Sequence, residues 1–337
     1  MTVESVPAAL EAKPLFGVRR TVPTHARLVG GVAFCLISLA ACALLGRKLT
    51  HTSWPLQGAQ VSLVLAAAAA YLASFGFRGV GWHHLFPSRE RPGRARCVAA
   101  CGAAAASGSV LPFRLDYVVK ISALRRLGGV RVGLGTIGLS LVVLGLVDAV
   151  AMLPLAVSAL VTSNALVRVP LIVVVVFCLG CLAILALGKR TTELPLVHRS
   201  RRVEMLFQRV AEDTRLSRST LAAAVFLFCC WSSRALGSTV LLSALGVSFS
   251  PRLALVVLCI SAAASLVPLT AGGAVAGIGT SAGVLVLLGV PHQTAVNFAL
   301  ASGLLLTTTA LAAGAFGFTA SLLRARGDRR AASPTAA

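Results

Sequence analysis

Acidic residues are scarce in this sequence. Of its 337 residues only 10 are Asp or Glu, and all charged residues together make up 12%, about half of the ~25% that is usual in soluble domains. Few candidate bases therefore exist, and the sequence contains no Ser-His-Asp set, no paired carboxylates and no Walker motif. The composition argues against a soluble globular protein, and we expect neither enzymatic activity nor a cofactor.

Clustered metal ligands are also lacking. The nine cysteines lie within or beside apolar segments, and two pairs have suggestive spacings, Cys97 with Cys101 and Cys178 with Cys181. A structural zinc site needs about four convergent Cys or His ligands, and no clustered partners accompany either pair. We therefore interpret the thiols as small buried hydrophobic groups and predict no metal site.

Long apolar runs dominate what is present. Hydrophobic residues make up 57% of the chain, and apolar runs of about 18 residues or more are long enough to cross a membrane as helices. Six runs qualify: 28–45, 59–77, 132–162, 169–187, 220–247 and 295–322. We predict an all-α polytopic membrane bundle with about six full spans, its transmembrane domain covering 28–322 between a cytoplasmic tail over 1–27 and a basic cytoplasmic tail over 323–337.

The excess of basic residues has a different meaning in such a protein. A net charge of +21 would suggest nucleic acid binding in a soluble chain. Here the Lys and Arg residues lie between apolar runs, where they orient the chain in the bilayer and contact anionic headgroups. We expect membrane lipids, anionic ones included, as partners and no nucleic acid.

The loop over 188–219 carries eight of these Lys and Arg residues. Four apolar residues in this loop fall on one face of a helix, namely Val203, Leu206, Phe207 and Val210. We predict a cytoplasmic amphipathic helix that lies on the membrane surface.

The basic residues also predict a hairpin. With a cytoplasmic N-terminus, the first two runs return the chain to the cytoplasm at Arg78. If the next apolar piece, 97–113, crossed the bilayer, it would place five basic residues outside, against the positive-inside bias: Arg114, Lys120, Arg125, Arg126 and Arg131. We predict instead that this piece enters and leaves on one side, with its bend at Pro112. Of the 31 Lys and Arg residues, 26 then lie inside and four outside.

A second apolar tract is broken by small residues. Its centre, "SLVPLTAGGAVAGIGTSAG" at 265–283, carries Pro268, Gly272 and Gly273, which remove a backbone donor and permit a sharp bend. The tract 253–290 is either a hairpin from the outer face or two crossings. Two hairpins from opposite faces are typical of transporters with broken helices, and the alternative is a kinked helix pair packed through small residues.

We expect the bend in "PLTAGG" to let two short helices border a polar cavity. Backbone groups freed by such a bend need hydrogen-bond partners, since each unsatisfied group in hydrocarbon costs several kcal/mol. Three nearby hydroxyl residues can supply some of them: Thr270, Thr280 and Ser281.

Two stretches resemble the transmembrane, flippase-like domain of lysylphosphatidylglycerol synthases. "LPFRLDYVVKISALRRLGG" at 111–129 is similar to the family pattern L-P-x-R-x-G-E-x-x-R. "VPLTAGGAVAGIGTSAGVLVLLGVPHQTAV" at 267–296 is similar to P-x-x-P-G-G-L-G-x-x-E followed by Gly-Val-Pro. The order and spacing of segments agree over roughly 30–320. Because only fifteen residues follow Leu322, we expect a member without the soluble synthase domain.

The chain departs from the family pattern at several polar positions. The Gly-Glu pair of the first motif is Asp116-Tyr117, and a Glu-Arg pair one turn before Asp148 is Leu144-Gly145. In the second motif a proline is Ala271, the glutamate position is Ile278, and a later arginine position is Gly303. The resemblance therefore implies a divergent member, in which most of the intramembrane polar groups are replaced.

Two charges fall deep within apolar runs, Asp148 and Arg234. A buried charge costs at least ~2.5–3.5 kcal/mol on insertion scales, so each needs a partner or a cavity. The two residues either pair with each other or bond separately to water or backbone. Four basic residues after the first hairpin form a second candidate site, because arginine binds phosphate through a bidentate fork: Arg114, Lys120, Arg125 and Arg126. The alternative is that this cluster only anchors the orientation.

These features favour a membrane lipid-handling protein. We expect flippase-like translocation or binding of a phosphate-bearing or polyprenyl-linked lipid, in the bacterial plasma membrane and with both termini cytoplasmic. One alternative is an accessory subunit that scaffolds a lipid or cell-envelope enzyme, which the replaced polar positions favour. A further alternative is a lipid-modifying transferase.

The distribution of basic residues generates a prediction about topology. A cysteine introduced in place of Arg125 should resist an impermeant thiol reagent in intact cells, because the segment 114–131 is expected on the cytoplasmic side. Labelling should appear once the cells are permeabilised. Ready labelling of intact cells would mean that 97–113 crosses the bilayer.

Overall fold

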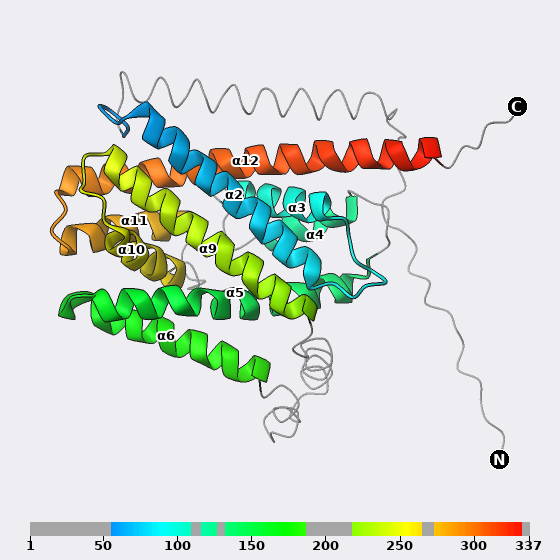
Figure 1. Cartoon of the computed structure of the whole chain (residues 1–337), viewed down its shortest axis with the longest axis horizontal. Helices are drawn as coiled ribbons and strands as arrows, with labels where there is room; N and C mark the ends of the chain where they lie inside the picture. Colours follow the sequence, from blue (N-terminus) through cyan, green and yellow to red (C-terminus); the bar gives the residue numbers. More distant parts are fainter. Residues whose placement is uncertain (1–54, 109–115, 127–131, 187–217, 265–272, 332–337) are drawn as a thin grey trace, which may run out of the picture.

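The computed structural model describes residues 55–108, 116–126, 132–186, 218–264 and 273–331. Within these ranges the chain is helical, and the helices form a bundle (Figure 1). The predicted all-α class is confirmed for this part of the chain. The first expected span, 28–45, and the amphipathic loop up to residue 217 lie outside the described residues.

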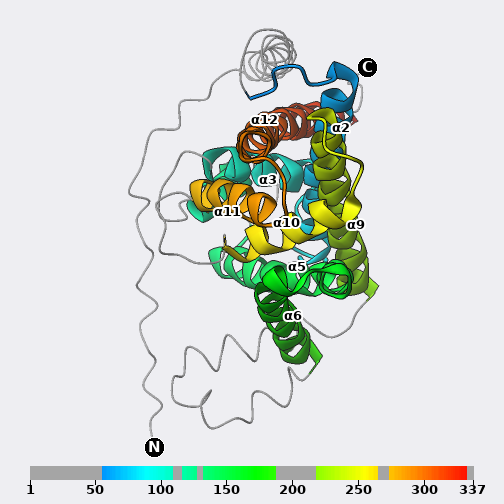
Figure 2. The same ribbon diagram turned by 90° about the vertical axis from the view of Figure 1, so that its left-hand side faces the viewer.

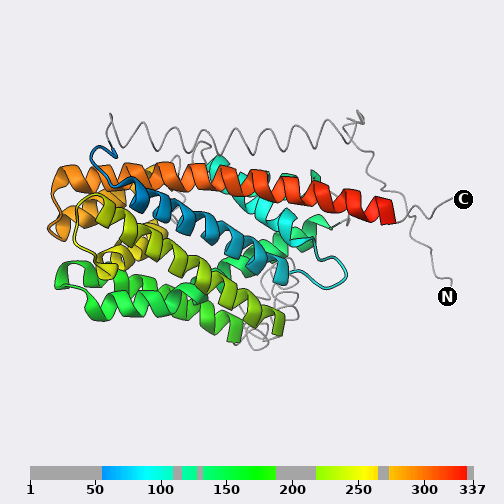
Figure 3. The ribbon, with the colours of Figure 1, turned by 45° about the horizontal axis from the view of Figure 1, so that its top comes forward.

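Five long helices are apolar enough to cross a membrane. They are α2 (Val61–His84), α5 (Leu134–Thr162), α6 (Ala165–Ala186), α9 (Arg218–Ala244) and α12 (His292–Ala331). Each corresponds to one predicted apolar run. They run lengthwise through the bundle, with α12 along one side and α6 on the outside of α5 (Figures 2 and 3). The helix α12 continues past the end of its apolar run at residue 322, through Arg324 to Ala331. Alanine and arginine are good helix formers in water as well.

Four short helices lie at the two stretches that the sequence marked as broken, but the first pair extends beyond the expected hairpin of 97–113. Residues 97–108 belong to one helix, and its partner helix begins at Asp116, in the segment expected to be cytoplasmic. The four helices are α3 (Arg94–Gly108), α4 (Asp116–Arg126), α10 (Pro251–Ala264) and α11 (Gly273–Leu287). With 11 to 15 residues each, they are about 16–22 Å long, which is shorter than the ~30 Å hydrocarbon layer. The helix α3 contacts α4, and α10 contacts α11, so each stretch forms two short helices that pack on each other.

The bends themselves are only partly described. Gly273 is the first residue of α11, whereas Pro112, Pro268 and Gly272 lie outside the described residues. Gly277, Ile278 and Ser281 of α11 lie on the wall of a cavity (below). The described part of this stretch therefore borders a cavity, and the expected bend at Pro268 and Gly272 stays a prediction.

Small residues allow the closest helix contacts. A Cβ atom added at Gly102 of α3 would lie 2.4 Å from the backbone nitrogen of Gly314 in α12. A Cβ at Gly317 would lie 2.6 Å from the carbonyl oxygen of Ala95. Because lipid is as apolar as a helix surface, association in a membrane depends on this close backbone packing. The glycines therefore place α3 directly against α12.

The outer helix α6 shows the opposite pattern. Its large side chains at Val169, Val173 and Val176 are exposed, and little of the helix is buried inside the bundle. In a membrane this face contacts lipid, which is why its sequence needs no polar residues. Gly180 of α6 has no atom within 4 Å of an added Cβ.

This contrast gives a matched test of the packing. Gly102→Ala should lower the free energy of unfolding by roughly 1–3 kcal/mol, the usual cost of overpacking. Gly180→Ala should be neutral or stabilise by up to ~1 kcal/mol, since alanine is the better helix former. Thermal or denaturant unfolding of the purified chain in detergent measures both. Equal effects of the two changes would show that α3 and α12 do not approach through Gly102.

Candidate functional site

A cavity of about 420 Å³ lies where the long and the short helices meet. Its wall takes residues from α2, α9 and α12 and from all four short helices. Small residues leave the space open, among them Ala104, Ala105, Gly108, Gly277 and Gly303. The two broken stretches, far apart in the sequence, therefore border one cavity.

Three basic side chains line this cavity: Arg78 of α2, Lys120 of α4 and Arg234 of α9. The one acidic residue on the described wall is Asp116. A second carboxylate, Asp148 of α5, is 8% exposed and lies beside the wall, bound to Arg78. Even when both carboxylates are counted, the formal charge around the cavity is positive.

The buried carboxylate joins three helices. Asp148 accepts a hydrogen bond from Nη2 of Arg78 at 2.6 Å, which is also a salt bridge. Its other oxygen accepts one from Nε1 of Trp231 in α9 at 2.9 Å. Both carboxylate oxygens are therefore engaged, and α2, α5 and α9 are held together at this point.

This arrangement corrects the pairing of Asp148 with Arg234. The partner of Asp148 is Arg78, and Arg234 binds elsewhere. Trp231 and Arg234 lie three residues apart on α9, and the tryptophan is the one that reaches the carboxylate. The sequence pattern assigned Arg78 to the membrane boundary, because the apolar run stops at Phe77. The helix continues to His84. Because further apolar residues follow Arg78 in this helix, the sequence contained a signal that Arg78 is a third deeply placed charge.

Arg234 has no carboxylate partner within salt-bridge distance among the described residues. Its Nε donates to Oγ of Ser74 at 3.4 Å. The guanidinium carbon lies 5.4 Å from the ring centre of Phe75 and 5.3 Å from that of Trp231, within the range of cation–π attraction. These contacts hold the side chain at the wall, and within the described ranges of the chain they do not use its terminal nitrogens for a hydrogen bond.

Lys120 of α4 lines the same cavity and, like Arg234, lies near an aromatic ring. It is 8% exposed, and its Nζ lies 4.9 Å from the ring centre of Trp82. Trp82 is in turn fixed by a 3.1 Å hydrogen bond from Nε1 to Oγ of Ser140. Burial lowers the pKa of Lys120, and the charge of Arg78 acts in the same direction. An anion in the cavity would oppose both effects, because it favours the charged ammonium.

The structure divides the four basic residues that the first motif offered for phosphate. Lys120 lines the cavity, whereas Arg125 and Arg126 are exposed at the end of α4 and are not on its wall. Residues five and six positions apart point about 140° and 120° away from one another on a helix, so these arginines cannot share the face of Lys120. Arg114 lies outside the described residues.

The wall formed by α10 and α11 is polar but uncharged. The hydroxyl of Ser281 donates to the carbonyl of Gly277 at 2.7 Å, and its oxygen lies 2.7 Å from that of Ser261. Of the other hydroxyl residues expected here, Thr280 is half-buried and Thr270 lies outside the described residues.

Two of the departures from the family pattern meet in this wall. A Cβ at Gly303 would lie 3.1 Å from Cδ1 of Ile278, and both residues line the cavity. These are the positions where the family pattern has an arginine and a glutamate. In this chain an isoleucine therefore approaches a glycine here, and this part of the wall carries no charge from either position.

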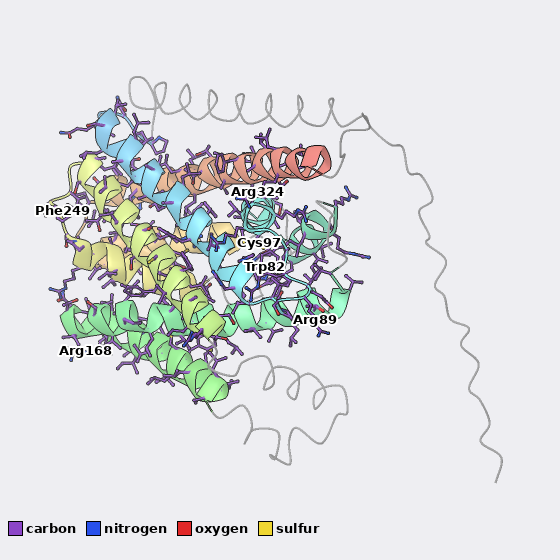
Figure 4. All side chains as sticks on the ribbon, turned by 45° about the vertical axis from the view of Figure 1, so that its right-hand side comes forward. Trp82, Arg89, Cys97, Arg168, Phe249 and Arg324 are labelled. Carbon is purple, nitrogen blue, oxygen red and sulfur yellow. The ribbon has the colours of Figure 1, made fainter. Side chains whose placement is uncertain are left out.

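The outer ends of the bundle carry the remaining charges. Figure 4 shows Arg168 and Phe249 towards one end of the long helices, and Arg89, Trp82, Cys97 and Arg324 away from that end. This separation agrees with the expected division of these arginines between the two membrane faces.

The buried salt bridge generates a test by double-mutant cycle. Arg78→Gln and Asp148→Asn should each lower the free energy of unfolding, by up to ~3–5 kcal/mol, because each leaves a buried partner uncompensated. The double variant should lose clearly less than the sum. Asp148→Asn combined with Arg125→Gln, on the exposed end of α4, should be additive. Additive losses for the first pair would refute the salt bridge.

Comparison with known proteins agrees with the sequence motifs. Residues 28–314 match the family described as the lysylphosphatidylglycerol synthase TM region, and the match includes the whole described cavity wall. No curated protein and no solved structure matches the chain. The family match covers well over half of the 337 residues, and the chain is an integral membrane protein that belongs to the lysylphosphatidylglycerol synthase TM family.

Proposed function

We propose that this protein binds a phosphate-bearing or polyprenyl-linked lipid, with the headgroup in the central cavity, and moves it across the bilayer as a flippase-like protein. The observation that carries the proposal is the cavity wall itself. Two cations, Lys120 and Arg234, face it without a salt bridge to any described residue. Membership of a family named for lipid synthesis supports a role with membrane lipids.

The energetics favour a ligand for these cations. A charge in the membrane interior is costly, and such residues are rare unless they pair or line a substrate path. Arg78 has its pair in Asp148. Arg234 has a neutral hydroxyl and two aromatic rings, which compensate a full charge only in part. A phosphate would complete the coordination through the bidentate geometry that arginine offers.

The size of the cavity matches a headgroup rather than a whole lipid. Its volume of about 420 Å³ falls in the ~300–1,000 Å³ range of small-molecule sites. Acyl or prenyl chains do not fit in the same space, so they would remain in the bilayer. Translocation needs a polar path for the headgroup only. The apolar chains stay in hydrocarbon while the lipid reorients, so their movement costs no desolvation.

The second candidate function is an accessory subunit that scaffolds a partner membrane enzyme. The observation that favours it is the apolar contact of Ile278 with Gly303, at positions where the family pattern is charged. A member that had lost transport could keep the fold and its surfaces. The retained cations favour the first candidate.

Reconstitution tests the proposal. The purified chain in liposomes should move a fluorescent phospholipid between leaflets, and Ala105→Leu, which adds bulk to the cavity wall, should slow this by about tenfold, equivalent to ~1.4 kcal/mol. Ala66→Leu is the matched control: this alanine is exposed on α2 and is not on the wall. It should leave the rate unchanged.

Two outcomes would contradict the proposal. Absence of both translocation and lipid binding in the well-folded wild-type chain would refute it, and stable co-purification with a membrane enzyme would then support the accessory role. An equal loss in the Ala105 and Ala66 variants would show that the cavity is not the route.

A further inference from the structure

The charges around the cavity also bear on which headgroups enter it. We infer that the cavity selects lipids whose headgroup has a net negative charge, against zwitterionic and cationic headgroups, and that Arg234 is the residue that determines this specificity. The inference rests on the proposed function, which it deepens by naming the substrate class.

The sign of the field follows from the charge count. Arg78, Lys120 and Arg234 give three positive charges on the wall. Asp116 on the wall and Asp148 behind it give two negative ones. The described residues therefore leave one positive charge in a site where the effective dielectric is low, so that the interaction with a headgroup charge is stronger than in water. A headgroup with a single net negative charge balances it.

Neither of the two carboxylates at the cavity is free to attract an ammonium group, because Asp116 on the wall already has an interaction. Asp148 accepts bonds at both of its oxygens, from Arg78 and from Trp231. The α10–α11 wall offers hydroxyls at Ser261 and Ser281 and no carboxylate among its described residues. An ammonium headgroup would therefore lose its hydration and meet an excess of cations, which is the repulsive element that discrimination requires.

Arg234 differs from the other two cations in position and in what holds it. Arg78 is neutralised by Asp148, and Lys120 lies on the short helix α4 against Trp82. Arg234 is sixteen residues from the start of α9 and ten from its end, so it lies deep in a membrane-spanning helix. Among the described residues its hydrogen-bond partner is Ser74, which it reaches through Nε. The terminal nitrogens are left to bind an anion, and the deep position is the one that a crossing headgroup must pass.

The experiment measures the transport rates of three fluorescent probes in liposomes: phosphatidylglycerol, phosphatidylethanolamine and an aminoacylated phosphatidylglycerol. For the wild-type chain we expect the first probe to move about tenfold faster or more than the second, and the third to be slowest, since an ammonium group meets the net positive charge of the wall and ~1.4 kcal/mol of repulsion supplies a tenfold factor. Arg234→Gln should bring the ratio of the first two rates close to one. Arg234→Lys should retain most of the preference, because it keeps the charge. Arg125→Gln, on the exposed end of α4, should not change the ratio.

A second pair of variants, at Ala105, tests the same inference if the Arg234 variants fail to fold. Ala105 is exposed at the cavity wall, so a longer side chain is tolerated there. Ala105→Glu should reverse or abolish the preference for the anionic probe, whereas Ala105→Gln, of equal size, should slow all three probes alike.

The outcomes separate this inference from the proposed function. Equal wild-type rates for all three probes would overturn the charge selectivity while leaving lipid transport intact, as would an unchanged ratio in both Arg234→Gln and Ala105→Glu. Failure of the wild-type chain to bind or move any probe would overturn the proposed function, and this inference with it.

Discussion

The salt bridge between Arg78 and Asp148 is the interaction on which the arrangement of the site depends. A carboxylate and a guanidinium inside a membrane bundle are each too costly to leave uncompensated, so the helices that carry them must meet at one point. Trp231 adds a third helix to this point through the second carboxylate oxygen. The mutual position of α2, α5 and α9 is thus determined by one ionic contact with both oxygens occupied.

The same contact decides which charges remain for a ligand. Because Arg78 takes Asp148, Arg234 is left with Ser74 and two aromatic rings, and it turns towards the cavity. Had Arg234 been the partner, the cavity would have kept a different cation on another helix. Which cation on the cavity wall stays without a carboxylate is therefore determined by which arginine pairs with Asp148.

Broken helices supply the space and small residues supply the contacts. Four helices of about 16–22 Å cannot fill the length that a full span fills, so their ends leave room in the interior of the bundle. Next to this space, α3 packs on α12 at backbone distance through Gly102, Gly314 and Gly317. The opposing demands of a tight contact and an open wall explain why alanine and glycine are so frequent in these segments.

The sequence by itself determined the elements of this protein. The apolar runs, the two broken stretches and the family could all be read from composition, periodicity and motifs, because a membrane allows few structures other than helices. Pairing was decided only by the tertiary structure. Arg78 sits at the end of an apolar run, and nothing local shows that α2 carries it inward to Asp148, seventy residues away. The separation of Lys120 from Arg125 and Arg126, and the meeting of Ile278 with Gly303, likewise depend on how helices rotate against one another. That rotation is set by packing over the whole bundle, which no single segment encodes.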